Sequence, residues 1–236
     1  MFSRIVLKRG AKPEGESPFW ISFSDLMSAL MFLFLVVMAV TLVQVTKKVT
    51  ADESASMQRK QDIEVILKLL KKDAPRDSVK MDGESLKIDL GTIVQFESGS
   101  HEIKAQAARD LRSYIPNLLR AKETAEGKRW MRRIIVEGYT DPDGTYLYNL
   151  GLSQDRSRSV VCALFAATSS GETPLTEPQL RQVQDLFMVG GYSFNTSVVA
   201  DKAAARKVEL KVEFWGVKDV LPENNKELSV KEFGKC

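Results

Sequence analysis

The sequence has few of the residues on which metal sites and disulfide frameworks depend. Its 236 residues include two cysteines, Cys162 and Cys236, and one histidine, His101. It contains neither a CxxC nor an HExxH motif, so we expect no zinc site of the usual kind. Two cysteines are too few for a framework, and whether they form one bridge stays open, since sequence cannot place them within bonding reach. We therefore predict no metal and no cofactor.

A large net charge is also absent. The chain carries 34 Lys and Arg against 31 Asp and Glu, a formal net charge of +3. Its basic residues form only short clusters, which are usually solvated surface, so we expect no direct nucleic-acid partner. Asp141 and Asp143 share a turn, but no nucleophile or metal-ligand set accompanies these two carboxylates. We therefore expect the protein not to be an enzyme.

What the chain does have is one long apolar run. Residues 19–46 contain a single charge, Asp25. At about 1.5 Å of rise per residue, a helix of this run exceeds a hydrocarbon core of about 30 Å. A cleavable signal peptide fits less well, because its apolar region spans only about 7–15 residues and ends at a small-residue cleavage site. The run therefore predicts one uncleaved transmembrane helix.

Basic residues before the run predict its orientation. Arg4, Lys8, Arg9 and Lys12 all precede residue 19. Positive charge is enriched on the cytoplasmic side of membrane helices. We therefore expect the N-terminus in the cytoplasm and the chain after Lys47 outside it.

Placing the carboxylate of Asp25 within such an apolar run costs free energy. A carboxylate at mid-membrane costs on the order of 2.5–3.5 kcal/mol on insertion scales, and less near an interface. Ser22, Ser28 and Ala29 share its helical face, and small residues allow close contact with another helix. The run has no second charge to pair with, so a partner must come from another chain. Two interpretations remain: a protonatable site, or a boundary residue that caps the helix or lies among headgroups.

Strand and helix patterns alternate beyond the membrane run. Within residues 47–77, apolar side chains at helical spacing predict a short amphipathic helix that ends at Pro75. Its apolar set is Ile63, Ile66, Leu67 and Leu70. Residues 85–96 predict a strand pair or one bent strand, and residues 133–139 and 208–215 each predict a strand. Helical patterns cover residues 103–119, 149–167 and 175–189. This alternation predicts an α/β sandwich, one sheet covered by helices, after a single N-terminal transmembrane helix.

One motif stands out after the strand at residues 133–139. Residues 138–144 read Gly-Tyr-Thr-Asp-Pro-Asp-Gly, and Tyr148, Asn149, Leu152 and Arg156 follow. Proline, aspartate and glycine predict a turn, after which a helix starting near Asn149 directs its amides to the same end of the sheet. A carboxylate from Asp141 and a guanidinium from Arg156 can then flank a small zwitterionic ligand. The alternative, in which the two simply pair with each other, stays open.

These residues resemble the OmpA-like peptidoglycan-binding family. The likeness extends over residues 85–214 and includes Phe96-x-Ser-Gly-Ser100, residues 191–193 and the closing segment 206–209. It implies a β-α-β-α-β sandwich that binds the diaminopimelate portion of the cell-wall peptide. Asp141 and Arg156 would be the paired ligand contacts, and the other implied binding residues are Tyr148, Asn149, Leu152 and Arg206.

Two positions depart from the family pattern. The usual histidine before Thr-Asp is Tyr139, and the asparagine of the closing Asn-Arg-Arg is Ala205. Loss of that asparagine affects the far wall of the implied pocket. The segment 169–189 is also longer than the family pattern needs.

The N-terminal part is similar to the B subunits of ion-driven stator units. Those subunits carry one Asp near the start of their only membrane helix, and Trp20 to Met27, with Asp25, corresponds to that element. The sequence of this helix looks closer to the stator-like B subunits of Zorya anti-phage defence systems than to flagellar ones. This resemblance implies that Asp25 carries protons. It also implies a homodimer of this chain within about five MotA-like membrane subunits, bound to peptidoglycan and acting indirectly on cytoplasmic defence effectors.

The expected organisation follows. We expect a single-pass protein of the bacterial inner membrane with a periplasmic C-terminal domain. The segments are a basic tail (1–18), a transmembrane helix (19–46), a partly helical linker (47–78), an OmpA-like domain (79–220) and a polar tail (221–236). Three functions remain: a defence motor, a flagellar or other envelope stator, and a passive wall anchor without ion flux.

Overall fold

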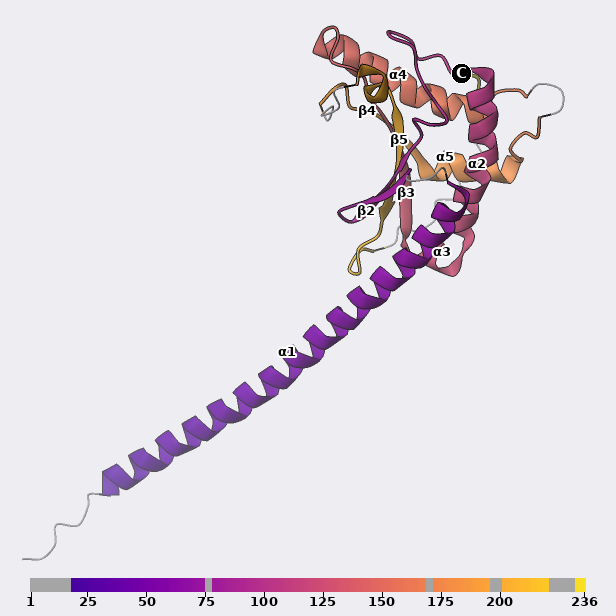
Figure 1. Ribbon diagram of the computed structural model, residues 1–236. Helices are drawn as coiled ribbons and strands as arrows, with labels where there is room; N and C mark the ends of the chain where they lie inside the picture. Colours follow the sequence, from indigo (N-terminus) through magenta and orange to yellow (C-terminus); the bar gives the residue numbers. More distant parts are fainter. Residues whose placement is uncertain (1–17, 75–77, 169–171, 196–200, 221–231) are drawn as a thin grey trace, which may run out of the picture. The chain divides into compact units, whose positions relative to one another are not determined.

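The computed structural model describes residues 18–74, 78–168, 172–195, 201–220 and 232–236. The chain divides into two compact units, Met1–Ser54 and Ala55–Cys236. One helix, α1 (Pro18–Asp73), contributes residues to both. The second unit contains all the strands and the remaining helices (Figure 1).

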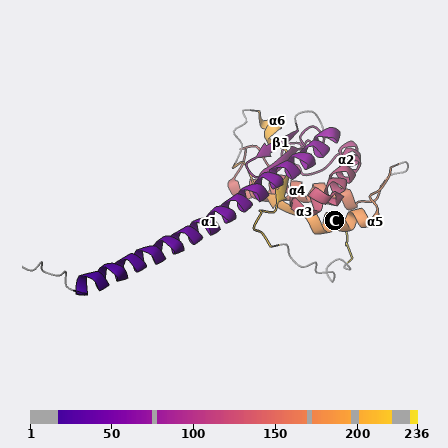
Figure 2. The same ribbon diagram turned by 90° about the horizontal axis from the view of Figure 1, so that it is seen from below.

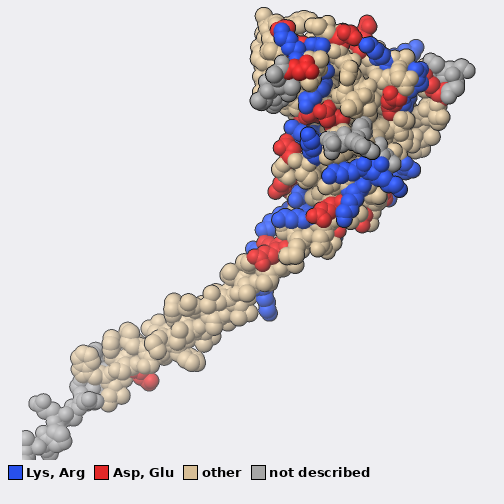
Figure 3. Space-filling model, viewed as in Figure 1, with Lys and Arg blue, Asp and Glu red and all other residues tan. Residues whose placement is uncertain are grey.

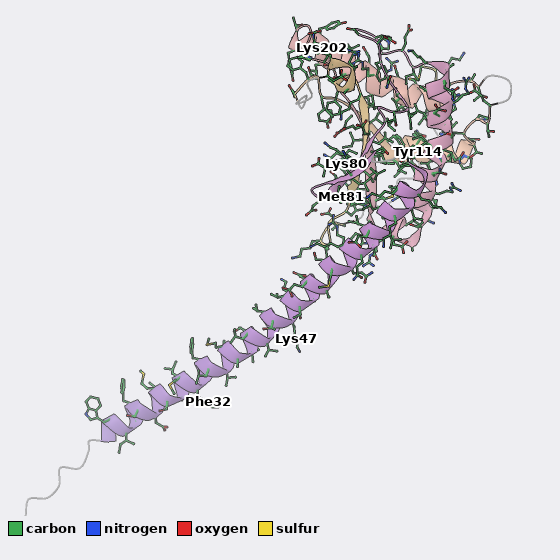
Figure 4. The ribbon with its side chains drawn as sticks, in the orientation of Figure 1. Phe32, Lys47, Lys80, Met81, Tyr114 and Lys202 are labelled. Carbon is green, nitrogen blue, oxygen red and sulfur yellow. A yellow bond between two sulfur atoms is a disulfide. The ribbon has the colours of Figure 1, made fainter. Side chains whose placement is uncertain are left out.

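Among the described residues, α1 is the one helix long and apolar enough to cross a membrane. Every side chain from residue 20 to 51 is exposed. Phe32 lies in the apolar part of α1, and Lys47 follows that part (Figure 4). The apolar part is almost uncharged at its surface (Figure 3). A separate short helix was expected after the membrane run, but α1 continues without a break because residues 19–74 contain neither proline nor glycine.

The second unit is built on a five-stranded mixed sheet with strand order β1-β2-β5-β3-β4. The strands are β1 (Val79–Asp82), β2 (Ser85–Asp89), β3 (Met131–Gly138), β4 (Phe187–Gly191) and β5 (Val208–Phe214). Only the β3–β4 pair is parallel. The central pairing of β3 with β5 brings the loop after β3 beside the segment that precedes β5.

Helices cover one face of this sheet, which confirms the predicted α/β class. They are α2 (Ala105–Glu123), α3 (Ala125–Trp130), α4 (Tyr146–Phe165) and α5 (Glu177–Leu186), and a short helix, α6 (Lys202–Ala205), precedes β5. Figures 1 and 2 show α2, α4 and α5 gathered on the same side. Ile63, Ile66 and Leu70 of α1 belong to the same buried core, so the last part of that helix is integral to this unit.

Several strands differ from the sequence expectation. The strand expected over residues 85–96 ends at Asp89, and an unexpected partner, β1, pairs with it through a turn at Gly83, whose φ is +59°. The helix expected over residues 175–189 ends at Leu186, because Phe187–Gly191 pairs with β3 instead. A tertiary pairing partner thus overrides the local helical pattern.

Cys162 and Cys236 form a disulfide, with their Cα atoms 5.8 Å apart. The bridge joins α4 to the end of the chain, where the Phe233 ring packs against Phe165 at a centroid distance of 5.1 Å. Cys162 is half-buried on α4. The bridge settles the pairing that the sequence left open.

Candidate ligand-binding site and membrane acid

The loop between β3 and α4 is held in place by its own side chains. The Asp143 amide donates to Oδ1 of Asp141 at 3.2 Å, and Nδ2 of Asn149 donates to the Asp143 carbonyl at 2.8 Å. Gly144 takes a φ of +99°, which favours glycine. The helix begins at Tyr146, three residues earlier than expected. Asn149 is 1% exposed, so it shapes the loop from within.

Two glycines let α4 approach the sheet closely. A Cβ atom on Gly138 would lie 2.0 Å from the Ser153 carbonyl oxygen, and one on Gly191 would lie 2.7 Å from the Gln154 amide nitrogen. Only residues without a side chain fit at such contacts. This close approach fixes how near α4 lies to the sheet, and so it also fixes the position of Arg156 further along the same helix.

Arg156 is fully buried and is held by backbone carbonyl groups. Its Nε donates to the Ser100 carbonyl at 2.9 Å, Nη1 to Tyr139 at 2.9 Å and Nη2 to Glu97 at 3.1 Å. Burial lowers the pKa of Arg156 to about 10; the charge of Arg206 acts in the same direction, while Asp141 opposes it. Arg156 therefore stays charged at neutral pH and joins the segment before α2 to the end of β3.

The ion-pair partner of Asp141 is Arg206 rather than Arg156. Nη1 of Arg206 lies 3.0 Å from Oδ2 of Asp141, and its Nε donates to the Phe96 carbonyl at 3.1 Å. The Asp141 side chain is 7% exposed and that of Arg206 is 18% exposed. The alternative that Asp141 and Arg156 pair directly is therefore wrong. All three charges nevertheless lie close enough to influence one another.

The remaining predicted residues take different positions. Tyr148 is 56% exposed, and its hydroxyl oxygen lies 3.4 Å from where a Cβ atom on Gly99 would be. Leu152 is 9% exposed and lies on the same face of α4 as Arg156, one turn earlier. The cluster thus unites Asp141, Arg156 and Arg206 with Tyr148 beside them.

Sequence reasoning missed the acceptors that hold the two arginines. They are the main-chain carbonyls of Phe96, Glu97, Ser100 and Tyr139. A backbone acceptor leaves no side-chain signature, and only the Phe96-x-Ser-Gly-Ser100 resemblance pointed to this segment. The ion pair between Lys202 and Asp143, at 2.7 Å, was also missed; Lys202 lies at the end of the unit where α4 begins (Figure 4).

Asp25 lies in the other unit, within the apolar part of α1. It follows the first helical residue, Pro18, by about two turns, so it does not cap the helix. The Ser28 hydroxyl, on the same helical face, donates to the Ser24 carbonyl at 2.8 Å. Asp25 is exposed in the single chain. The interpretation of Asp25 as a helix cap is therefore wrong, and a position among the headgroups stays the alternative to a protonatable site.

Among the described residues, no group of three or more His, Cys, Asp or Glu side chains is placed to hold a metal ion. The charged cluster around Asp141 offers hydrogen bonds and charge to a ligand. It contains one carboxylate and two guanidinium groups, which are donors to carboxylates.

Comparison with known proteins identifies relatives. A family model described as membrane MotB of the proton-channel complex MotA/MotB matches residues 7–58. Zorya protein ZorB of Escherichia coli O139:H28 (strain E24377A / ETEC) is 38% identical over 215 residues, covering 90% of this chain and 87% of the relative. Zorya protein ZorB of Escherichia coli strain ATCC 8739 is 28% identical over 175 residues, covering 67% of this chain and 72% of the relative.

Similarity to solved structures is lower. A putative MotB-like protein from Desulfovibrio vulgaris is 14% identical, with a TM-score of 0.45, and covers 70% of this chain and 97% of that protein. Because the first relative is 38% identical across 90% of the sequence, this chain belongs to the family of Zorya protein ZorB.

Proposed function

We propose that this chain is the proton-carrying, peptidoglycan-anchored B subunit of an inner-membrane rotary motor in a Zorya anti-phage defence system. Family membership supports the defence context. The match of residues 7–58 to the MotB model supports a MotA-like membrane partner. The observation that carries the motor is Asp25, a lone carboxylate two turns inside an apolar helix that this chain leaves uncovered.

Proton transfer at Asp25 supplies the driving force. Burying its charge at mid-membrane costs on the order of 2.5–3.5 kcal/mol, so protonation changes which surroundings the side chain prefers. Each proton that crosses the membrane releases about 2.3 kcal/mol per 100 mV. Two copies of this chain form the centre of a ring of about five MotA-like subunits. The change in preferred contact at Asp25 then drives rotation of one part against the other.

The disulfide supports a periplasmic location for the second unit. Cys162 and Cys236 are bonded, and disulfides persist in oxidising compartments such as the bacterial periplasm. The basic residues before the membrane helix independently favour a cytoplasmic N-terminus. Two unrelated properties of the chain therefore favour the same orientation.

The cluster around Asp141 anchors the motor to the cell wall. Its charges suit a wall peptide, which presents carboxylates and, where it is not cross-linked, a free amine. Asp141, Arg156 and Arg206 supply the charges, Tyr148 lies at the exposed edge, and Asn149 orders the loop. A stationary anchor is what a rotary motor needs, because torque acts only against a fixed part.

Asp25→Asn tests the proposal, with Ser28→Ala as the matched control on the same helix face. Both variants are expressed with the native gene neighbourhood, and phage protection is assayed at equal membrane abundance. We expect Asp25→Asn to abolish protection and Ser28→Ala to retain it, because Asn cannot carry a proton. Protection by Asp25→Asn equal to that of wild type would leave a passive anchor as the function.

A further inference from the structure

Two exposed arginines lie over tryptophan rings where α3 runs into β3. The guanidinium carbon of Arg129 is 4.7 Å from the centre of the Trp130 ring, and that of Arg132 is 4.6 Å from the centre of the Trp215 ring. The two indoles belong to neighbouring segments, because the Trp215 amide donates to the Trp130 carbonyl at 2.8 Å. A guanidinium stacked by its face keeps its N–H groups at its edge, where they can bind a carboxylate through two parallel hydrogen bonds. We call these four residues the arginine–tryptophan surface.

The start of β3 turns Arg132 outward. The register between β3 and β5 shifts between Met131 and Arg133, which leaves Arg132 without a partner residue on β5. An extra residue of this kind often re-aims a side chain. Within the described part of the chain, Arg132 makes no ion pair, and its charged group contacts the Trp215 ring. Its N–H groups are therefore available to another molecule.

Most acids beside this surface already have a cation. Three of them form ion pairs of 2.7–3.4 Å, namely Glu123 with Lys128, Glu213 with Arg133 and Glu84 with Arg59. The Asp62 carboxylate accepts the Trp130 indole N–H at 2.7 Å and lies 3.9 Å from Arg129. The further charges nearby balance in number, since Lys122 and Lys218 stand against Glu126 and Asp219. The excess positive charge is thus carried by Arg132 and by Arg129, whose side chain is 60% exposed.

The arginine–tryptophan surface lies where α1 enters the second unit. Nε of Arg59 donates to the Trp215 carbonyl at 2.7 Å, and Asp62 binds Trp130. Arg59 follows residue 46, the end of the apolar run, by 13 residues, which is about 20 Å of helix. The headgroup layer adds only about 5–8 Å to each side of the hydrocarbon core. The helix is therefore long enough to carry this surface past the headgroups, to the level at which the proposed MotA-like ring surrounds the two copies.

We propose that the arginine–tryptophan surface docks on acidic side chains at the periplasmic face of the MotA-like ring. This inference rests on the proposed function and names the contact chemistry of the partner. A lipid surface fits less well, because membrane-interface tryptophans insert their rings among the headgroups, whereas Trp130 is 5% exposed and both indoles carry an arginine. The subunits of the ring are identical, so the contact re-forms with the next subunit as one part turns against the other.

Photo-crosslinking in the assembled complex identifies the partner. Benzoylphenylalanine is placed at Val217, which is 38% exposed and follows Trp215 by two residues, or at the control position Met188, which is 47% exposed on β4. Cells that carry the native gene neighbourhood are irradiated, and the cross-linked species are identified by mass spectrometry. We expect the Val217 position to cross-link to the MotA-like partner and the Met188 position not to. A Val217 position that reaches only lipid, only the second copy, or nothing would overturn the inference.

Neutral variants test the charge of the contact. Arg129→Gln/Arg132→Gln should lower the yield of the partner cross-link from Val217 at least about threefold, since two exposed ionic contacts are lost. Arg129→Lys/Arg132→Lys should keep part of the yield, because it retains the charge without the planar edge. Lys80→Gln/Arg158→Gln removes two exposed charges elsewhere on the unit and should leave the yield unchanged. A yield that is equal in the wild type and in the glutamine variant would contradict the docking surface.

Phage protection and retention on isolated wall sacculi separate failure of this inference from failure of the proposed function. Wild type that protects cells but gives no partner cross-link would refute the docking surface and leave the motor intact. Wild type that gives no protection in its native gene neighbourhood would refute the motor itself. Loss of the cross-link in a glutamine variant that sacculi still retain would support the docking surface, since its wall domain is folded. If sacculi no longer retain that variant, the lysine variant replaces it in the same comparison.

Discussion

At the scale of single residues, the candidate site depends on two glycines that allow α4 to pack closely against the sheet. Gly138 and Gly191 occupy positions where a Cβ atom would overlap the backbone of α4. Arg156 is carried by the same helix, and its three carbonyl partners come from two separate segments. The Arg156 guanidinium can therefore reach all three carbonyls only if α4 packs this closely against the sheet.

Gly138→Ala should accordingly destabilise the protein. The added Cβ would meet the Ser153 carbonyl at 2.0 Å, and overpacking of this kind costs about 1–3 kcal/mol. Gly151→Ala is the matched control in α4, where nothing lies within 4 Å; it should stabilise by about 0.5–1 kcal/mol. Chemical denaturation followed by tryptophan fluorescence measures both. Equal stability of the two variants would show that the close approach is not rigid.

Asp62 on α1 gives a second residue-scale test. Its Oδ2 accepts a 2.7 Å hydrogen bond from the Trp130 indole, and this bond holds the pKa of Asp62 below its usual value. A depressed carboxylate pKa contributes stability that is present above the unfolded pKa, near 3.8, and is lost as pH falls through the lower folded value.

Asp62→Asn keeps an oxygen acceptor for the Trp130 indole but removes its charge, so it should cost about 1 kcal/mol at neutral pH, the difference between a hydrogen bond to a charged and to a neutral acceptor. The difference from wild type should shrink as pH falls below about 4. Glu64→Gln, at an exposed position of the same helix, is the matched control and should cost less than Asp62→Asn at neutral pH. A cost that stays constant down to low pH would contradict the assigned pKa direction.

At the scale of elements, sequence patterns predicted what local chemistry determines. The apolar run forms part of α1, the strand predicted at residues 133–139 is β3, and the Asp-Pro-Asp-Gly turn leads into α4. The sequence patterns failed where the structure of a segment depends on the strand that pairs with it. Phe187–Gly191 continues a helical pattern in sequence but pairs with β3 in the fold, and Val79–Asp82 is a strand only because β2 lies beside it.

The same distinction explains how much of the site was predictable. Asp141, Arg156 and Arg206 were found because their side chains are ionic and lie in recognisable motifs. Their connections were not found, because the structure pairs Asp141 with Arg206, 65 residues away in sequence, and holds Arg156 with carbonyl groups. Main-chain acceptors exist at every residue, so only the folded geometry selects among them.

At the scale of the whole molecule, one chain carries both the proposed proton site and the proposed wall-binding domain. Asp25 lies in the unit Met1–Ser54 and the charged cluster lies in the unit Ala55–Cys236. Helix α1 continues from one unit into the other without proline or glycine. The proposed motor needs both units, one to convert proton flow into movement and one to hold the wall.

Proton flux is the most direct measurement of the central claim. The chain is reconstituted in vesicles with its native MotA-like partner, a membrane potential is imposed, and internal pH is followed with a sensitive dye. We predict flux with wild type, reduced flux with Asp25→Glu, which keeps a titratable carboxylate, and none above empty vesicles with Asp25→Asn. Equal flux through wild type and Asp25→Asn would contradict the account.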